Sequence, residues 1–160
     1  MKQAVLALAL AAVLGSLPLP AAEAVPLKDF ASLMAALESG GSVRAVFRYK
    51  EMALTVAGKP ESVVPDAVGG MALDAWEAFA PGAVGNAERY VTSSESRLIR
   101  HPRYGVVYNY VKVSIYESGA VKILAQYLDP RTFKVRMDET FAARIAGESG
   151  EGGAFFFRLD

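Results

Sequence analysis

Histidine is the residue type best suited to act as an acid or base at neutral pH, so a catalytic acid or base would be sought first at His101, the only histidine of the chain. A Ser-His-Asp triad also needs a serine in an ordered nucleophile turn. Ser93, Ser94 and Ser96 lie nearby in the sequence, but no nucleophile-elbow pattern surrounds them. One histidine and no cysteine leave no ligand set typical of zinc. We therefore expect no catalytic residue, metal or cofactor, and a small hydrolase using His101 is the alternative.

Two polar residues interrupt the apolar alternation of the C-terminal half. In residues 133–145 the odd positions are apolar except for Glu139, and from 107 to 115 every second residue is valine or isoleucine except for Asn109. An unpaired buried carboxylate or carboxamide costs several kcal/mol, so both need partners. Either both line a ligand cavity, or a bulge at Asp138-Glu139 or a bond to an arginine satisfies Glu139.

Aromatic and basic residues complete the set of candidates. His101 and Arg103 belong to an expected loop between two strands, residues 101–105. Tyr108, Tyr110 and Tyr116 share the strand face opposite Asn109, and tyrosines there suit sugar binding or a protein interface. The same face could instead be the seat of the N-terminal helix, which we favour. The candidate ligand-binding residues are Glu139, Asn109, Tyr108, Tyr110, His101 and Arg103.

Hydrophobic periodicity predicts one helix followed by strands. Apolar residues at positions 30, 33, 34 and 37 fall on one helical face, Asp29 suits the N-cap, and Gly40-Gly41 ends the helix. Residues 68–79 are expected to be extended with a bend or bulge at Gly69-Gly70, and a short helix over 72–79 is the rival. A hairpin turn is expected at Ser118-Gly119, and a type I turn at Asp129–Thr132. Further strands are expected over 43–49, 54–56, 89–100, 106–117, 121–128, 133–145 and 154–159.

These elements predict a mainly β fold with one N-terminal α-helix. Short turns leave no room for crossover helices, so neighbouring strands are expected to be antiparallel. A meander of about eight strands is expected to curl into a barrel or half-barrel, because closure removes exposed edges.

The first 24 residues have the pattern of a cleaved signal peptide. Lys2 is followed by a run from Ala4 to Leu17 that is almost wholly alanine, valine and leucine, and Ala22-Glu23-Ala24 matches a signal-peptidase site. A membrane-spanning helix would need roughly 20 apolar residues, which exceeds this run. We expect cleavage after Ala24, residues 25–160 as a single domain, and no integral membrane segment after cleavage.

Charge narrows the choice of partners. The 17 basic and 17 acidic residues of the chain balance, and removal of Lys2 and Glu23 leaves 16 of each. A balanced charge provides no electrostatic footprint for nucleic acid or an anionic membrane. The expected partner is therefore an unknown small ligand or an envelope protein.

Several blocks of the sequence match one protein family in order. They are Pro65-Asp66-Ala67-Val68-Gly69-Gly70-Met71, Trp76-Glu77-x-Phe79, Leu98-Ile99-x-His101-Pro102-Arg103-Tyr104-Gly105-Val106-Val107-Tyr108-Asn109-Tyr110-Val111, and Tyr127-Leu128-Asp129-Pro130-x-Thr132-Phe133-x-Val135-x-Met137-Asp138-Glu139-Thr140-Phe141. Together these blocks resemble the VirK family of bacterial exported proteins, and the similarity extends from about Phe30 to Phe157. The resemblance implies a periplasmic or secreted protein of a Gram-negative bacterium, associated by name with virulence loci. It supplies no catalytic residue or ligand.

Together these features favour a non-enzymatic periplasmic binding module or virulence-associated accessory module. Besides the hydrolase, the other alternative is a structural assembly or interaction protein of the cell envelope that uses its tyrosine face.

Overall fold

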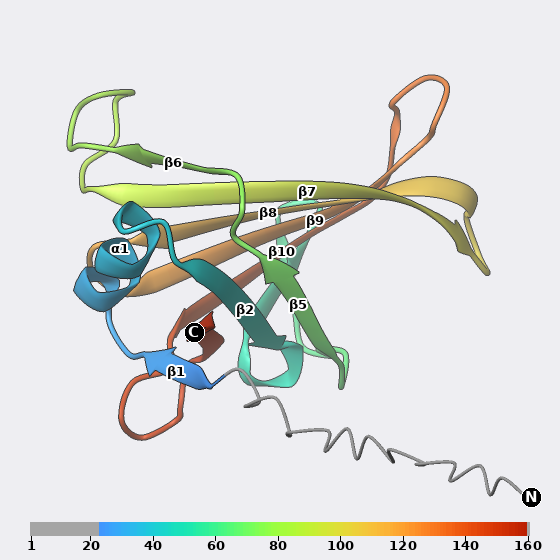
Figure 1. The fold of residues 1–160 in the computed structure, drawn as a ribbon. Coiled ribbons are helices and arrows are strands. Elements are labelled where there is room, and N and C mark those ends of the chain that lie inside the picture. Colours follow the sequence, from blue (N-terminus) through green and yellow to red (C-terminus); the bar gives the residue numbers. More distant parts are fainter. Residues whose placement is uncertain (1–22, 160) are drawn as a thin grey trace, which may run out of the picture.

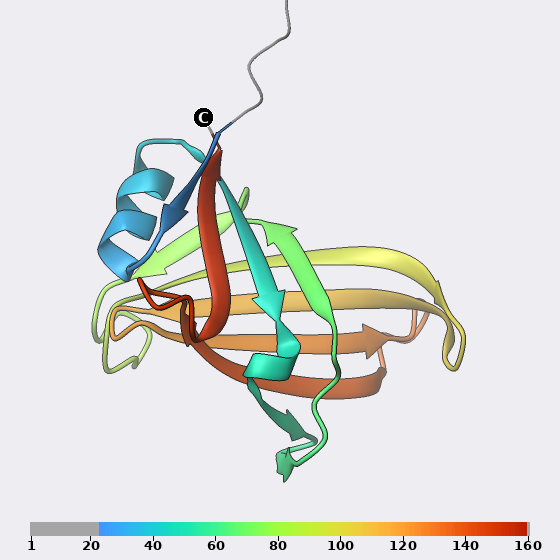
Figure 2. The ribbon, with the colours of Figure 1, turned by 90° about the horizontal axis from the view of Figure 1, so that it is seen from below.

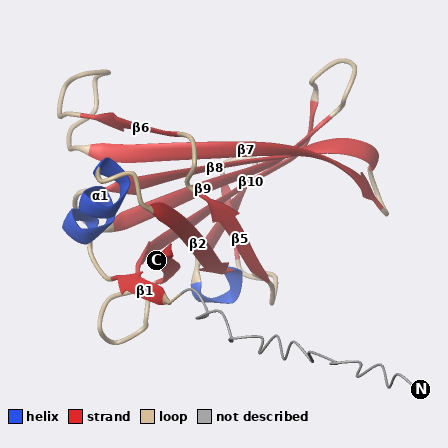
Figure 3. Ribbon diagram, viewed as in Figure 1, coloured by secondary structure: helices blue, strands red, loops and turns tan. Residues whose placement is uncertain are grey.

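The computed structural model describes residues 23–159, in which one α-helix and a curled sheet account for most of the chain (Figures 1 and 3). The predicted signal peptide lies outside this range except for its last two residues. No helix in the described range is long and apolar enough to span a membrane. The elements are β1 (Ala24–Leu27), α1 (Phe30–Glu38), β2 (Ser42–Arg48), the 3-10 helix η1 (Tyr49–Glu51), β3 (Ala53–Val56), β4 (Lys59–Glu61), β5 (Val68–Ala72), β6 (Trp76–Phe79), β7 (Tyr90–His101), β8 (Gly105–Tyr116), β9 (Ala120–Leu128), β10 (Val135–Ile145) and β11 (Gly153–Leu159).

The sheet forms a mostly antiparallel half-barrel, which confirms the predicted fold class. Eight strands follow one another in the order β5-β2-β11-β10-β9-β8-β7-β6, while β1 pairs with β11 and the β3–β4 hairpin pairs with β10. The long strands β7 to β10 lie side by side, and β1, β11, β2 and β5 cross them on the concave side (Figure 2).

The expectation of a purely antiparallel meander is wrong at one end of the sheet. From β6 to β10 each strand pairs with the next in sequence, but the chain then loops through residues 146–152 and returns beside β10 in the same direction. The parallel contact comprises two residue pairs, Arg144 with Gly153 and Ile145 with Ala154. The final strand, β11, then pairs along its length with β2, so a strand from the C-terminal end of the domain lies beside one from its N-terminal part.

The predicted helix is confirmed. The Asp29 carboxylate accepts the Ser32 backbone N–H at 2.7 Å, which holds the Asp29 pKa below its ordinary value, and Gly40 ends the helix at φ 78°. The buried helix face belongs to the same hydrophobic cluster as Val113 and Ile123 of the long strands. The helix therefore closes one end of the half-barrel from the concave side.

This position contradicts the proposed helix seat on the tyrosines. Tyr108, Tyr110 and Tyr116 alternate with the buried Val107, Val113 and Ile115, and so lie on the convex face. There the Tyr108 ring stacks on Phe133 with centroids 6.3 Å apart, and not on the helix. The alternation correctly placed the tyrosines together on one face of the strand. It did not reveal that the helix packs on the opposite, concave face of the curled sheet.

Residues 68–79 are extended, as expected, but the break does not occur at the glycines. Gly69 pairs with Phe47 and Gly70 with Val46 without a register shift, and the chain leaves the sheet only between β5 and β6. A Cβ atom on Gly69 would lie 2.6 Å from the Tyr49 hydroxyl, so glycine here serves the close approach of that side chain.

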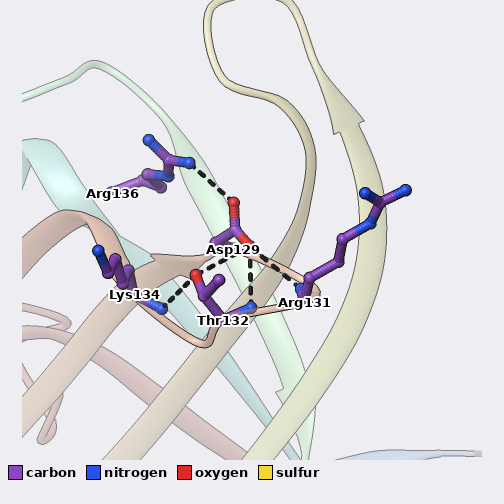
Figure 4. Close-up of polar contacts among 5 residues, drawn as sticks. All are labelled: Asp129, Arg131, Thr132, Lys134 and Arg136. Carbon is purple, nitrogen blue, oxygen red and sulfur yellow. Dashed lines mark hydrogen bonds and ion pairs between the residues drawn. The ribbon is translucent and has the colours of Figure 1, made fainter.

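The expected alternation of residues 133–145 fails at its start. Asp129 accepts hydrogen bonds from the backbone N–H groups of Arg131 and Thr132 at 3.1 and 3.0 Å and from Arg136 at 2.8 Å (Figure 4). This turn leaves Phe133 in the left-handed region at φ 56° and 65% exposed. The register shifts between Val135 and Met137, so the inward phase begins only at Met137.

Candidate functional site

The concave face becomes more polar with distance from the helix. Strands β7 and β8 contain 12 residues each, against 7 in β2 and 5 in β5, so part of their inner face extends beyond the crossing strands. Cross-strand pairing places the inner residues in rows. The row beside the core is Ser93, Val113, Ile123, Phe141 and Leu54; the next is Glu95, Val111, Ala125, Glu139 and Val56; the third is Arg97, Asn109, Tyr127 and Met137.

A pocket of about 180 Å³ lies over the second and third rows, and we call it the cup pocket. It contains both Glu139 and Asn109, the two polar residues that interrupt the apolar alternation of the C-terminal half. The small side chain of Ala125, between Val111 and Glu139, leaves the space open. The lining residues are Tyr49, Pro65, Ala67, Asn109, Val111, Ala125, Tyr127, Met137, Glu139 and Phe141.

Polar side chains in the cup pocket lack protein partners. Within residues 23–159, no other protein group hydrogen-bonds to the side chains of Glu139, Asn109, Tyr49 or Tyr127, and none of their polar atoms is sealed from solvent. The bulge at Val135–Met137 does not turn Glu139 outward, and no arginine in this range bonds to it. Their hydrogen-bonding capacity is therefore available to water or to a ligand.

Partial burial in the cup pocket raises the pKa values of its acidic groups. Partial burial raises the pKa of the Glu139 carboxyl above its ordinary value. Burial also raises the pKa of Tyr49, with smaller contributions from Tyr127 and from the negative charge of Glu139. The pKa of Tyr127 is raised for the same reasons, burial first and then Glu139 and Tyr104. The pocket thus places one partly desolvated carboxyl group among phenols whose pKa values are also raised.

A wider depression of about 430 Å³, the rim pocket, adjoins the cup pocket and shares Met137 and Glu139 with it. Arg103 and Tyr104 line its outer side, and the Arg103 guanidinium lies 5.3 Å from the centre of the Tyr104 ring. Arg136 is also part of the lining, but its guanidinium is bonded to Asp129. A ligand in the cup pocket could extend outward along this rim.

His101 lies behind the pocket and does not line it. Its ring contacts Tyr127 and Tyr104, with centroids 4.8 and 5.0 Å away. Its Nδ1 atom accepts the backbone N–H groups of Arg103 and Tyr104 at 3.1 and 3.3 Å, so the neutral ring carries its proton on Nε2. No carboxylate or hydroxyl in residues 23–159 hydrogen-bonds to this ring, and no group of three acidic or histidine side chains in that range is placed to hold a metal ion.

The structure thus brings together only part of the predicted site. Glu139 and Asn109 share the cup pocket, Arg103 lines the rim, and Tyr108 and Tyr110 lie on the convex face. The sequence reasoning missed Tyr127, although the alternation of 121, 123, 125 and 127 would have placed it beside Asn109. It also missed Tyr49 as a site residue: the strand predicted over 43–49 ends at Arg48, and Tyr49 lies in η1.

Another open depression, of about 550 Å³, lies beside β6 and is lined partly by Trp76, Ser93 and Lys112. The Ser93 hydroxyl already donates to the Ala75 carbonyl oxygen at 2.7 Å, and the Thr92 hydroxyl donates to the Val113 carbonyl oxygen at 2.8 Å. Because these hydroxyls hold the β6 connection and the β7–β8 pair, the cup pocket is the stronger candidate.

The fold and the site define a half-barrel that is closed by a helix at one end and has an open polar pocket at the other. The family model described as "VirK protein" matches residues 26–133, so the chain belongs to the VirK family. The crystal structure of lpg1832, a VirK family protein from Legionella pneumophila, has the same fold: it is 16% identical, with a TM-score of 0.62 over 83% of this chain and 98% of that one. No curated protein matches the sequence.

Proposed function

We propose that this VirK family protein is a non-enzymatic module that binds a small ligand in the cup pocket. One observation carries the proposal: two phenols, a carboxamide and a carboxylate converge on an apolar, concave pocket, and none has a protein partner within the described residues. Recognition sites for small molecules combine such apolar walls with a few convergent polar groups. The ligand would combine an apolar body with at least one polar group.

A binding role fits the pocket better than catalysis. His101 is outside the cup pocket, and its Nδ1 is already engaged by the loop backbone. Glu139 has no second carboxylate in the lining with which to divide acid and base roles. The geometry therefore favours retention of a ligand over its transformation.

Filling the pocket tests this function. We expect Ala125→Leu to project three additional carbons into the open space and to abolish the binding of compounds found by ligand-observed NMR with a fragment library. The matched control is Ala142→Leu, an equal change at an exposed position on the opposite face of β10. Hits that bind both variants like the unmodified protein would contradict binding in the cup pocket.

Removal of the polar groups provides a second test. Glu139→Ala and Asn109→Ala are expected to weaken the same hits severalfold and leave the urea midpoint nearly unchanged, because neither side chain has a protein hydrogen bond to lose. If both substitutions destabilise the protein by more than about 1 kcal/mol and leave binding unchanged, the two residues are structural.

We also infer that the protein functions after export to the periplasm or the medium. The predicted cleavage after Ala24 would remove only the first residue of β1 and keep Val25 and Leu27 in register with Arg158 and Phe156. Mass spectrometry of the protein from fractionated Gram-negative cells should therefore find Val25 as the N-terminus in the periplasm or medium. An intact residue 1–24 segment in the cytoplasmic fraction would contradict export.

A further inference from the structure

The cup pocket contains a negative charge and no positive one. Its ten lining residues include Glu139 but no lysine, arginine or histidine. We propose that the ligand of the cup pocket carries an organic ammonium group that pairs with the Glu139 carboxylate. This inference rests on the proposed function and names the chemical class of the ligand.

Cations near the pocket have other partners. Arg97 is bonded to Glu95 at 3.2 Å, and Arg136 to Asp129 at 2.8 Å. Arg103 lies against the ring of Tyr104, on the outer side of the rim. Within residues 23–159, Glu139 thus has no ion-pair partner, and a cation entering the pocket would displace none. An anionic group would instead face the carboxylate across a partly desolvated space.

The walls suit a cation that also has an apolar part. The Tyr49 and Tyr127 rings line the pocket beside Glu139, and the electron-rich faces of such rings attract ammonium groups. The Met137 thioether is polarisable, and Val111 and Phe141 provide apolar contact. The Asn109 carbonyl oxygen can accept one ammonium N–H. Carboxylate, ring faces and carboxamide oxygen are thus complementary to a primary amine.

The volume limits the size of the ligand. At about 30 Å³ for each water in the liquid, 180 Å³ corresponds to about six water molecules, so a body of about six non-hydrogen atoms would fill it. Pentylammonium has this size and is the appropriate probe. For so small a ligand, a dissociation constant of about 1 mM is expected.

The test is a titration of ¹⁵N-labelled protein, residues 25–160, at low salt and pH 7, with pentylammonium, 1-pentanol and pentanoate. We expect pentylammonium to shift the amides of residues 109, 125, 127 and 139 and to bind about tenfold more tightly than pentanol, with pentanoate weakest. Glu139→Gln should reduce the affinity for pentylammonium about tenfold. The control Glu117→Gln removes an acidic charge from an exposed turn that lines neither the cup pocket nor the rim pocket, and it should have no effect.

The outcomes separate this inference from the proposed function. If pentanol or pentanoate binds as tightly as the amine, or if Glu139→Gln leaves the affinity for the amine unchanged, the ammonium assignment is overturned. The ammonium assignment is also overturned if pentylammonium produces no chemical-shift changes at about 20 mM, roughly twenty times the expected dissociation constant. The proposed function is overturned only if Ala125→Leu fails to block compounds that bind the unmodified protein.

One further arm identifies the source of the ammonium. Nα-acetyl-lysine methylamide presents the same amine on a peptide backbone, which would lie along the rim pocket. Binding at least as tight as that of pentylammonium would assign the site to a lysine side chain of a protein. Binding of the free amine alone would assign it to a small metabolite.

Discussion

Gly69 and Tyr49 provide a sharp test of how the cup pocket is built. A Cβ atom at position 69 would lie 2.6 Å from the Tyr49 hydroxyl oxygen and 2.9 Å from its Cε2 atom, while ordinary contacts begin near 3.4 Å. The Tyr49 ring would have to move by about 0.8 Å. It cannot do so freely, because the same ring also packs on Phe141 with centroids 4.6 Å apart. Gly69→Ala should therefore push Tyr49 into the pocket.

Two opposing contributions set the size of the stability change expected for Gly69→Ala. Overpacking of this kind costs about 1–3 kcal/mol, while alanine in place of glycine at an unstrained strand position contributes about 0.4–1 kcal/mol through the unfolded state. We expect Gly69→Ala to lower the free energy of unfolding by about 1.5 kcal/mol, which for an m-value of about 2 kcal/mol/M lowers the urea midpoint by roughly 0.7 M. In a Tyr49→Ala background the clash disappears, and Gly69→Ala should stabilise by about 0.5 kcal/mol.

The four proteins of this double-mutant cycle are unfolded in urea and followed by far-UV circular dichroism. The cycle shows whether the effect of Gly69→Ala on the free energy of unfolding changes sign when the Tyr49 ring is removed. Gly70→Ala is the matched control, since a Cβ atom there would approach the Ala45 carbonyl oxygen at 3.1 Å and not Tyr49. Its effect should be the same in both backgrounds. An equal cost of Gly69→Ala with and without the tyrosine ring would refute the reasoning.

Three further substitutions probe charge and packing. Because burial raises the Glu139 pKa, the stability this group contributes is complete below the ordinary carboxyl pKa and is lost as pH rises through the raised value. Glu139→Gln should therefore raise the urea midpoint at pH 7 and leave it unchanged at pH 3.5. The Asp129 pKa is lowered by Arg136 and by the turn amides, so the carboxylate stays ionised well below the ordinary pKa and is lost only on strong acidification. Asp129→Ala should therefore speed hydrogen exchange of those amides at pH 4 as well as at pH 7, and an effect seen at pH 7 that disappears at pH 4 would contradict this. Leu33 is fully buried in α1, and Leu33→Ala should cost about 3 kcal/mol in urea unfolding, whereas a cost below about 1 kcal/mol would mean that the helix is not docked inside the half-barrel.

The parts of the fold that could be predicted from the sequence depend on short-range chemistry. Asp29 and Gly40 bound the helix because a capping carboxylate and a left-handed glycine act within one turn. The Gly119 hairpin and the Asp129 turn formed where expected for the same reason. In β8 the period of two also placed Asn109 on the inner face.

Long-range pairing could not be predicted in this way. The insertion of β11 between β10 and β2 depends on partners about 110 residues apart, and no local pattern encodes such a choice. Phe133 and Val135 look like the start of an inward phase, but the turn at Asp129 and the shifted register expose both. The tyrosine face was assigned to the helix because alternation separates two faces without revealing which becomes concave.

The position of Glu139 along β10 explains why a charge persists there. One row closer to the helix, Phe141 is buried under the crossing strands, where an unpaired carboxylate would be neutralised or would destabilise the fold. One row farther out are Tyr127 and Asn109, and beyond them the face is open to water, where a carboxylate would be screened and would attract a cation only weakly. At the boundary the carboxylate remains accessible while losing part of its hydration, as its raised pKa reflects. The covering strand β2 ends at Arg48 and is followed by η1. The point where this cover ends therefore determines where along β10 a charged residue can lie without destabilising the fold and still bind a cationic ligand.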